Sequence, residues 1–396
     1  MLLEKKILQA QKYLKEMDLE GWLLYDFHKN NPLAHRFLEI SGNTLFTRRF
    51  FYWIPAQGEP VKIVHAIESH GPDAWPGEKR IFLSWQSLEK TLGTLLQGVK
   101  RIAMEYSPKN AIPYVSWVDG GTLDLIRSFG VEVTSSANFL PYFTAVISPA
   151  QGESHRRASQ ALEKIVNDTW DWIAEQLKKG ACFTEYDVQQ KVLYDFREKK
   201  LVTDNAPIVA VNTHSADPHY EPKKQSSSFI KKGDFILIDL WAKEVGDLSI
   251  FGDITRVAVA SNNPTDRQNE IFQIVRKAQV AAIDLVSHRF NKRERVEGWE
   301  IDDAARKVIQ KAGYADFFLH RTGHSIETSL HGSGANIDNL EMHDVRPILA
   351  GTCFSVEPGI YLPNEFGVRL ESDVYVHGNG TVEVTGGEQE SLLALF

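Results

Sequence analysis

Hydrophobic and polar positions along the first part of the chain follow two alternating periods. Apolar residues recur at helical spacing over 3–17 and 120–129, which predicts amphipathic helices. Short apolar runs bounded by turn residues predict strands at 22–25, 50–54, 61–66, 102–105 and 131–134. Gly58-Glu59-Pro60 predicts a hairpin between the second and third strands, and the polar stretch 28–41 is expected to be a loop. This alternation predicts an α/β domain over residues 1–150 with a mostly buried sheet.

A second set of helices and strands follows residues 147–152, whose composition indicates a linker. Helical periodicity covers 153–178, 185–200, 266–290 and 299–312, and the Thr184-Glu185-Tyr186-Asp187 sequence has the pattern of a capping box. Strand patterns cover 235–242, 253–260, 353–362, 367–376 and 382–385. We therefore expect a second domain over residues 151–396 and an α+β fold for the chain.

Composition narrows the functional classes. The 396 residues are 43% hydrophobic and 24% charged, which is typical of a globular protein with a large core. The net charge of −8 argues against binding to nucleic acid or to an anionic membrane, and no apolar run is long enough to span a bilayer. The N-terminal helix lacks the apolar core of a signal peptide, and Cys182 and Cys353 suggest no disulfide framework. A cytoplasmic location is therefore expected.

Two aspartates lie in strongly apolar strand patterns of the second domain. A period of two places Asp239 on the same strand face as Phe235 and Leu237. Asp253 opens the next strand directly after Gly252, so an antiparallel pairing of the two strands brings the carboxylates together. A buried ionised carboxylate is costly unless it is paired, hydrogen-bonded or bound to a cation. Taken alone, Asp239 is explained equally well by hydrogen bonds to the backbone or to an arginine.

Two glutamates have similar surroundings near the end of the chain. Glu357 ends an apolar run, and Pro358 removes a backbone donor so that the strand stops where the acid points. Glu371 shares a strand face with Arg369 and Asp373. This polar stripe is either a solvated face or the floor of a polar site in which Arg369 orients an acid.

Histidines are concentrated in the stretch HRTGHSIETSLH, which places His320, His324 and His331 within twelve residues. The stretch is either helical or extended and irregular, because Gly323 weakens the helical pattern. Neutral imidazole is a good ligand for divalent transition metals. His219 lies between two prolines, in a rigid turn that is either part of a site or an ordinary surface loop. Together with four buried acids, the histidines indicate a metal site.

The order of these motifs resembles the creatinase/aminopeptidase P/prolidase superfamily of pita-bread metallopeptidases, family M24. The matching motifs are Pro218-His219-Tyr220, Asp239, Gly252-Asp253-Ile254-Thr255-Arg256, His320-x3-His324-x6-His331, Val356-Glu357-Pro358-Gly359 and Gly367-Val368-Arg369-x-Glu371. They cover residues 150–396. The resemblance extends more loosely to residues 1–150, where these relatives carry a creatinase-type α/β N-terminal domain, and it implies a pita-bread catalytic domain after it.

The resemblance also implies a site for two divalent metal ions, usually manganese, cobalt or zinc, with manganese ranked first. Asp239 would be a terminal ligand of one metal, and His324 and Glu357 would bind the other. Asp253 and Glu371 would bridge the two ions. The four negative charges of these ligands match the four positive charges of two divalent cations, which explains why so many acids are buried.

Roles for the remaining motif residues follow from the same resemblance. His219 and His331 would contact the substrate and the transition state, with His320 beside them, and Arg369 would hold a carboxylate in place. A hydroxide shared by the two metals would attack the scissile carbonyl. His331 or His219 would stabilise the developing oxyanion, and Glu357 would carry a proton to the leaving amine.

The implied reaction is hydrolysis of an Xaa-Pro peptide bond in a substrate with proline at its second position. Two activities are close rivals, an Xaa-Pro dipeptidase (prolidase) and an Xaa-Pro aminopeptidase (aminopeptidase P), and the modest chain length favours the dipeptidase. A metal-free creatinase-like amidinohydrolase or a non-catalytic binding protein fits less well, because all five metal ligands are present.

The sequence departs from the family pattern at positions next to the expected metal ligands. Relatives often have Asp-x-Gly where this chain has Asp239-Leu240-Trp241. After His324 they tend to carry glycines and a Val-His-Glu, whereas this chain has Glu327, Thr328 and Gly332 and a non-standard stretch over 325–330. These changes put substrate specificity in doubt. The family commonly forms homodimers, which we expect here. The aromatic run 50–53 belongs either to such an interface or to the core of the first domain.

Overall fold

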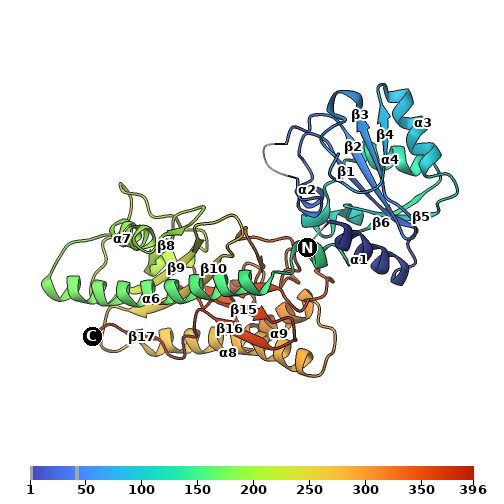
Figure 1. Ribbon diagram of the computed structural model, residues 1–396. Helices are drawn as coiled ribbons and strands as arrows, with labels where there is room; N and C mark the ends of the chain where they lie inside the picture. The colour runs from blue at the N-terminus through green and yellow to red at the C-terminus, as the bar shows by residue number, and fades with distance from the viewer. Residues whose placement is uncertain (1–2, 41–43) are drawn as a thin grey trace. The chain divides into compact units, whose positions relative to one another are not determined.

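The computed structural model describes residues 3–40 and 44–396. The chain divides into two compact units, Met1–Thr144 and Ala145–Phe396 (Figure 1). The predicted boundary at residue 150 falls inside helix α6 (Pro149–Lys179). Residues 147–152 are therefore not a linker. Ser148 caps the helix by accepting a hydrogen bond from the Gln151 backbone, the Gln151 side chain accepts one from Ser148 N in return, and Pro149 occupies the first helical position.

Unit 1 contains a six-stranded sheet in the order β4-β3-β2-β1-β5-β6, in which only β2 runs antiparallel to its neighbours. The strands are β1 (Gly21–Asp26), β2 (Phe50–Pro55), β3 (Val61–His65), β4 (Glu78–Phe82), β5 (Arg101–Met104) and β6 (Glu132–Ser135). Its helices are α1 (Leu3–Glu16), α2 (Pro32–Phe37), α3 (Trp85–Leu95), α4 (Gly120–Ser128) and α5 (Pro141–Thr144). The predicted hairpin is the β2–β3 pair.

Two features of unit 1 differ from the sequence prediction. The stretch expected to be a loop contains α2, because the Asn31 side chain caps Ala34 N at 3.1 Å and Pro32 opens the helix; its last residue, Ser41, lies outside the described residues. The aromatic residues 50–53 are core, since none exposes more than 5% of its surface. They cannot form an interface in this unit without unpacking the sheet.

Unit 2 places helices on both sides of its strands (Figure 1). The helices are α6, α7 (Glu185–Glu198), α8 (Asp266–Asn291) and α9 (Gly298–Lys311). One sheet has the order β17-β10-β9-β7 with β8 also paired to β9, a second has the order β11-β12-β15-β16, and β13 pairs with β14. The strands are β7 (Leu201–Val202), β8 (Ile208–Val211), β9 (Phe235–Glu244), β10 (Gly252–Val259), β11 (Ser325–Ile326), β12 (Cys353–Val356), β13 (Gly359–Tyr361), β14 (Gly367–Arg369), β15 (Ser372–Val376), β16 (Val382–Thr385) and β17 (Leu393–Ala394). The predicted α+β class is confirmed.

The two faces of β9 belong to different cores. Ile236 and Ile238 pack with apolar residues of α6 and α7. Phe235 and Leu237 pack with apolar residues of α8 and α9. Asp239 continues the second face, as the period of two predicts. A carboxylate therefore stands where the apolar pattern calls for another core side chain.

Two predicted strands are each broken into two. The run 353–362 forms β12 and β13, separated at Glu357-Pro358, because proline lacks the N–H that a ladder needs. The run 367–376 forms β14 and β15, and Glu371 between them donates its backbone N–H to the Thr255 carbonyl at 3.3 Å. Both glutamates thus stand where the chain leaves one ladder for another.

None of the helices in residues 3–40 and 44–396 combines the length and the apolar character that a membrane span requires.

Candidate metal centre

The antiparallel pairing of β9 and β10 brings the two aspartates to one face. Asp239 lies opposite Thr255, and Asp253 lies opposite Trp241, so the two carboxylates are diagonal neighbours. Both residues are buried, with 7% and 4% of their surfaces exposed. The convergence predicted from the apolar pattern is therefore present.

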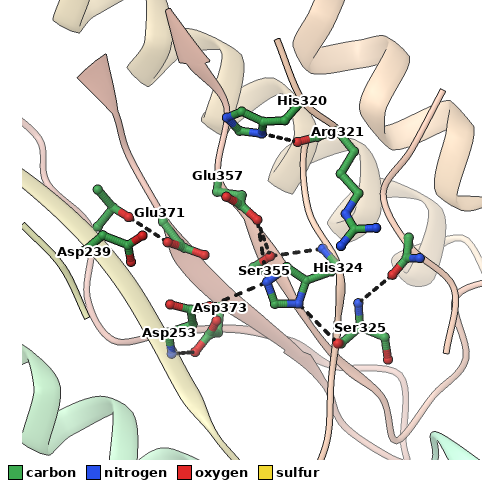
Figure 2. Close-up of polar contacts among 12 residues, drawn as sticks. Asp239, Asp253, His320, Arg321, His324, Ser325, Ser355, Glu357, Glu371 and Asp373 are labelled. Atoms are coloured by element: carbon green, nitrogen blue, oxygen red, sulfur yellow. Dashed lines mark hydrogen bonds and ion pairs between the residues drawn. The ribbon is translucent and has the colours of Figure 1, made fainter. Parts of the chain in front are cut away.

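His324 enters the same face from the histidine segment. This segment is not helical and contains only the two-residue strand β11. The backbone of His324 is tied to Ser355 of β12 by hydrogen bonds of 2.9 and 3.0 Å. Its Nε2 lies 3.5 Å from Asp253 Oδ2 and 3.6 Å from Glu357 Oε1 (Figure 2).

Glu371 completes a group of three. Its Oε2 accepts a 2.7 Å hydrogen bond from Thr255 Oγ1, and the residue is 2% exposed. One ligand atom each from Asp253, His324 and Glu371 lies within 4.8 Å of the others. Figure 2 shows these side chains, with Asp239 and Glu357, directed toward a common region.

Arg369 connects this group to its surroundings through three of its nitrogens. Nη2 donates to Asp239 Oδ2 at 2.5 Å, Nε to Thr255 Oγ1 at 3.2 Å and Nη1 to Tyr361 Oη at 2.9 Å. Tyr361 Oη also lies 2.6 Å from His320 Nε2, while His320 Nδ1 lies 2.7 Å from the Arg321 carbonyl. Both His320 nitrogens are therefore engaged, and burial together with the Arg369 charge lowers the pKa of His320 to about 3.

A cavity of about 550 Å³ opens over these residues. It is lined by all nine predicted site residues: His219, Asp239, Asp253, His320, His324, His331, Glu357, Arg369 and Glu371. His219 and His331 are exposed at the cavity wall, and the His331 ring stands perpendicular to His324 with centroids 4.3 Å apart. The volume suits a small ligand.

The chemistry of the donor set fits divalent metal ions. Burial and the neighbouring Glu371 charge raise the pKa of Asp253, and burial raises the pKa of Glu357 to about 7. Asp239 Oδ1 and Asp253 Oδ1 are buried without a hydrogen-bond partner in the part of the chain that the structure describes. Burial also lowers the pKa of His324, and its Nδ1 faces the Ser325 carbonyl at 3.3 Å, so the neutral ring directs the Nε2 lone pair at the acids. Cations would satisfy both the orphaned oxygens and the clustered charges.

Three residues that orient this set have no role in the sequence prediction, although Thr255 and Asp373 lie in its motifs. Thr255 binds both Glu371 and Arg369, and Tyr361 binds both Arg369 and His320. Asp373 Oδ2 accepts a 2.8 Å hydrogen bond from Asp253 N. A role for Thr255 could have been inferred from the sequence, because the period of two places it on the same strand face as Asp253. No sequence pattern indicated a role for Tyr361, because the residues that it binds come from other segments of the chain.

The unusual stretch between His324 and His331 is held by its own acid. Glu327 is fully buried, and its Oε1 accepts hydrogen bonds from Ser333 N at 2.8 Å and Gly334 N at 3.0 Å. Nearby, buried Asp302 accepts from both the backbone and the hydroxyl of Thr322, at 2.9 and 2.6 Å. These residues fix the backbone on either side of His324.

The family model described as "Metallopeptidase family M24" matches residues 153–378, which is more than half of the chain and includes all nine site residues. The chain belongs to metallopeptidase family M24. The membership inferred from the motif order is thereby confirmed. The matched region begins in α6 and ends after β15, so it spans every candidate metal ligand.

Relatives of this M24 chain include an Xaa-Pro dipeptidase of Lactobacillus delbrueckii subsp. lactis, which is 35% identical over 201 residues. That match covers 50% of this chain and 49% of the relative. The chain thus spans about half the length of the curated relative that it matches.

Solved structures confirm the fold over the whole chain. Dipeptidase PepE from Mycobacterium ulcerans superposes with a TM-score of 0.72 at 21% identity and covers 100% of this chain and 98% of its own. An X-prolyl aminopeptidase from Caenorhabditis elegans, described as a cytosolic enzyme with a di-nuclear active site, gives 0.63 at 17% identity, covering 97% of this chain and 62% of its own. The pita-bread architecture expected for the second domain is the fold that such structures share.

Proposed function

We propose that this M24 chain is a metal-dependent peptidase that hydrolyses Xaa-Pro bonds, and that it acts as an Xaa-Pro dipeptidase. The observation that carries the proposal is the meeting of Asp253, His324 and Glu371 within 4.8 Å at the floor of a cavity. The Xaa-Pro dipeptidase relative supports the substrate class. The cavity volume of about 550 Å³ suits a dipeptide.

Five residues would hold two divalent cations. Asp239 and Asp253 each contribute a buried oxygen without a protein partner, and His324 contributes its neutral Nε2. Glu357 and Glu371 would complete the set. Manganese, cobalt and zinc all accept such mixed nitrogen and oxygen ligands, and manganese is our first candidate. The di-nuclear site named for the C. elegans aminopeptidase supports two ions rather than one.

Bound cations would supply Lewis-acid polarisation of the scissile carbonyl and would lower the pKa of the attacking water. Glu357, which lines the cavity, would accept the water proton at its carboxylate and deliver it to the leaving nitrogen. His331 and His219, both exposed at the cavity wall, hydrogen-bond to the carbonyl oxygen as negative charge develops. His320, whose ring nitrogens are both engaged, shapes the wall, and Arg369 orients Asp239.

A proline leaving group is compatible with this arrangement. The Xaa-Pro amide is tertiary and has no N–H. A peptidase that needs a hydrogen bond from the N–H of the scissile amide therefore cannot cleave this bond. None of the roles above requires that donor. Arg321 lines the cavity and places a positive charge where the carboxylate of a dipeptide would be attracted.

The rival activity is Xaa-Pro aminopeptidase, because an X-prolyl aminopeptidase shares the fold. A length series separates the two: Ala-Pro, Ala-Pro-Ala and Ala-Pro-Ala-Ala are assayed at equal concentration by chromatography of the products. A dipeptidase loses activity as soon as the proline carboxylate is extended. Equal or rising turnover with length would assign the aminopeptidase instead.

Metal removal tests the proposal directly. Chelation followed by desalting should abolish hydrolysis, and Mn²⁺ or Co²⁺ should restore it. Asp253→Asn should lower the metal content per chain, measured by atomic emission, because an amide replaces a charged ligand. Asp284→Asn, at an exposed position of α8, is the matched control and should keep the wild-type content. Full Xaa-Pro hydrolysis by metal-free protein would contradict the proposal.

We also propose that the protein is cytoplasmic and homodimeric. The two cysteines are free, and the C. elegans aminopeptidase is described as cytosolic. Sedimentation velocity of the full chain should give about twice the mass of 44.8 kDa. A single species at the monomer mass would contradict the dimer.

A further inference from the structure

One buried carboxylate, Glu185 in the first turn of α7, gathers hydrogen bonds from three separate segments. Its Oε1 accepts from Val211 N at 2.8 Å and lies 2.8 Å from His214 Nδ1. Its Oε2 accepts from Tyr220 Oη at 2.6 Å and from Ser228 N at 2.8 Å. The residue is 0% exposed, so these contacts occur out of water.

The segments that Glu185 binds frame the loop that carries His219. Val211 ends β8, and Ser228 closes the loop where Phe229 forms a bridge with Thr184. Between them, the Tyr220 ring stacks on His214 with centroids 4.2 Å apart. The anchored residue Tyr220 is the immediate neighbour of His219.

Other contacts of this loop leave His219 weakly fixed. Ser215 Oγ accepts a hydrogen bond from Gly367 N at 2.8 Å, which ties the start of the loop to β14. Among the described residues, His219 N donates to Asp217 Oδ1 at 3.1 Å within the same turn, and Arg369 Nη1 makes a long contact of 3.5 Å with the neighbouring Pro218 carbonyl. The side chain that links the His219–Tyr220 part of the loop to a helix is therefore Glu185, through the Tyr220 hydroxyl.

Glu185 does not line the cavity, and its oxygens are already taken by four groups. A direct part in binding metal or substrate is thus excluded by its placement. The carboxylate is, however, better suited to this position than any neutral group, since all of its partners present hydrogens and both of its oxygens accept.

We propose that Glu185 is a positioning residue that sets His219 for contact with the substrate. This inference rests on the function proposed above, in which His219 touches the scissile carbonyl. Because Glu185 acts through the loop, its removal matters for catalysis only as long as His219 is present.

Glu185→Gln is the sharpest test, because the amide keeps the shape but its nitrogen cannot accept from the loop donors. We expect kcat/KM for Ala-Pro to fall about tenfold, with the metal content unchanged. In a His219→Ala background the same substitution should cause no further loss, since the histidine it positions is gone. An equal loss in both backgrounds would overturn the positioning role.

Glu105→Gln in unit 1 is the matched control, because Glu105 is also 0% exposed and also accepts hydrogen bonds from neutral side chains. It should leave kcat/KM within about twofold of the wild type. Tyr220→Phe removes a single donor from Glu185 and serves if the glutamine variant does not fold. It should lower kcat/KM in the same direction but by less.

Limited trypsin digestion tests the loop without any substrate. Lys223 and Lys224 are exposed in the loop, so loss of its anchor should speed cleavage there relative to the rest of the chain. Cleavage of Glu185→Gln at the wild-type rate would overturn the inference. If the wild-type chain hydrolyses no Xaa-Pro peptide, the proposed function fails, while the trypsin rates still decide whether Glu185 holds the loop.

Discussion

At the scale of single residues, Arg369 shows how one side chain organises several others. Its planar guanidinium presents donors in a fixed fork, and here they bind a carboxylate, a threonine and a tyrosine at the same time. With Asp239 Oδ2 held by the arginine, Oδ1 remains the oxygen without a partner among the described residues. The fork thus selects which oxygen of Asp239 is available to a cation.

Arg369→Lys should therefore weaken the site although the charge is kept. A lysine ammonium cannot reach Asp239, Thr255 and Tyr361 with the same geometry. We expect kcat/KM to fall by about 10–100-fold, the range typical for lost support of a metal ligand. Arg197→Lys, at an exposed position of α7, controls for the substitution itself. Wild-type kcat/KM in Arg369→Lys would contradict this role.

Glu105, the residue that follows β5, links stability to pH. Trp22 Nε1 and Asn31 Nδ2 donate to its two oxygens, but burial dominates and raises its pKa from 4.5 to about 7. The folded state therefore favours the protonated form. The resulting stabilisation is present below pH 4.5 and is lost as the pH rises through 7.

Glu105→Gln should remove this dependence. Between pH 5 and pH 8 the free energy of unfolding of the wild type should fall by about 2–3 kcal/mol relative to the variant, the equivalent of the pKa shift. Urea unfolding followed by fluorescence at the two pH values measures the difference. Parallel pH profiles for the two proteins would show that Glu105 does not titrate in this range.

Sequence reasoning located the acids and histidines because their chemistry conflicts with their surroundings. A carboxylate such as Asp239 in an apolar strand has to be explained, whatever the fold. Thr255 and Tyr361 carry no such conflict, since a threonine in a strand and a tyrosine in a core are ordinary. Their importance arises only from side chains that the fold brings to them.

At the scale of elements, the long helices and strands were predictable and the breaks were not. Periodicity specified α8 and β9 to within a few residues. The apolar run through Glu357 looks continuous, however, because the pattern reports burial and not the partner strand. Proline at 358 was visible, but the change of partner at Glu371 depends on Thr255, more than a hundred residues earlier.

Gly323 allows the His324 segment to lie against β12. A Cβ atom at this position would lie 1.9 Å from the Ser355 carbonyl oxygen, which is backbone and cannot move aside. Gly323→Ala should therefore lower the melting temperature and weaken metal binding, because His324 is displaced from Asp253. Gly378→Ala, which meets nothing within 4 Å, is the control. Calorimetry and metal titration together measure both effects, and a Gly323→Ala protein with wild-type values would rule out the tight approach.

At the scale of the whole molecule, the two units have separate hydrophobic cores. One core joins the sheet of unit 1 to its helices, and others lie on the two sides of β9 in unit 2. All candidate metal ligands, from Asp239 to Glu371, belong to unit 2. A bound metal should therefore stabilise one unit and not the other.

Differential scanning calorimetry tests this division. Metal at about a thousand times its dissociation constant adds about 4 kcal/mol to the stability of the unit that binds it. We expect two transitions, of which one moves to higher temperature when metal is added and the other stays. A single transition, or equal movement of both, would mean that the units unfold together.

The separate anchors of the site loops have a consequence for divergence among relatives. Glu185 secures the His219 loop, Asp302 secures Thr322 before His324, and Glu327 secures the turn that follows. Each loop thus has an anchoring carboxylate of its own, and none of these three carboxylates is a candidate metal ligand. Substrate preference can therefore change during evolution through one loop at a time. A loop transferred from a relative together with its anchoring acid should keep its conformation.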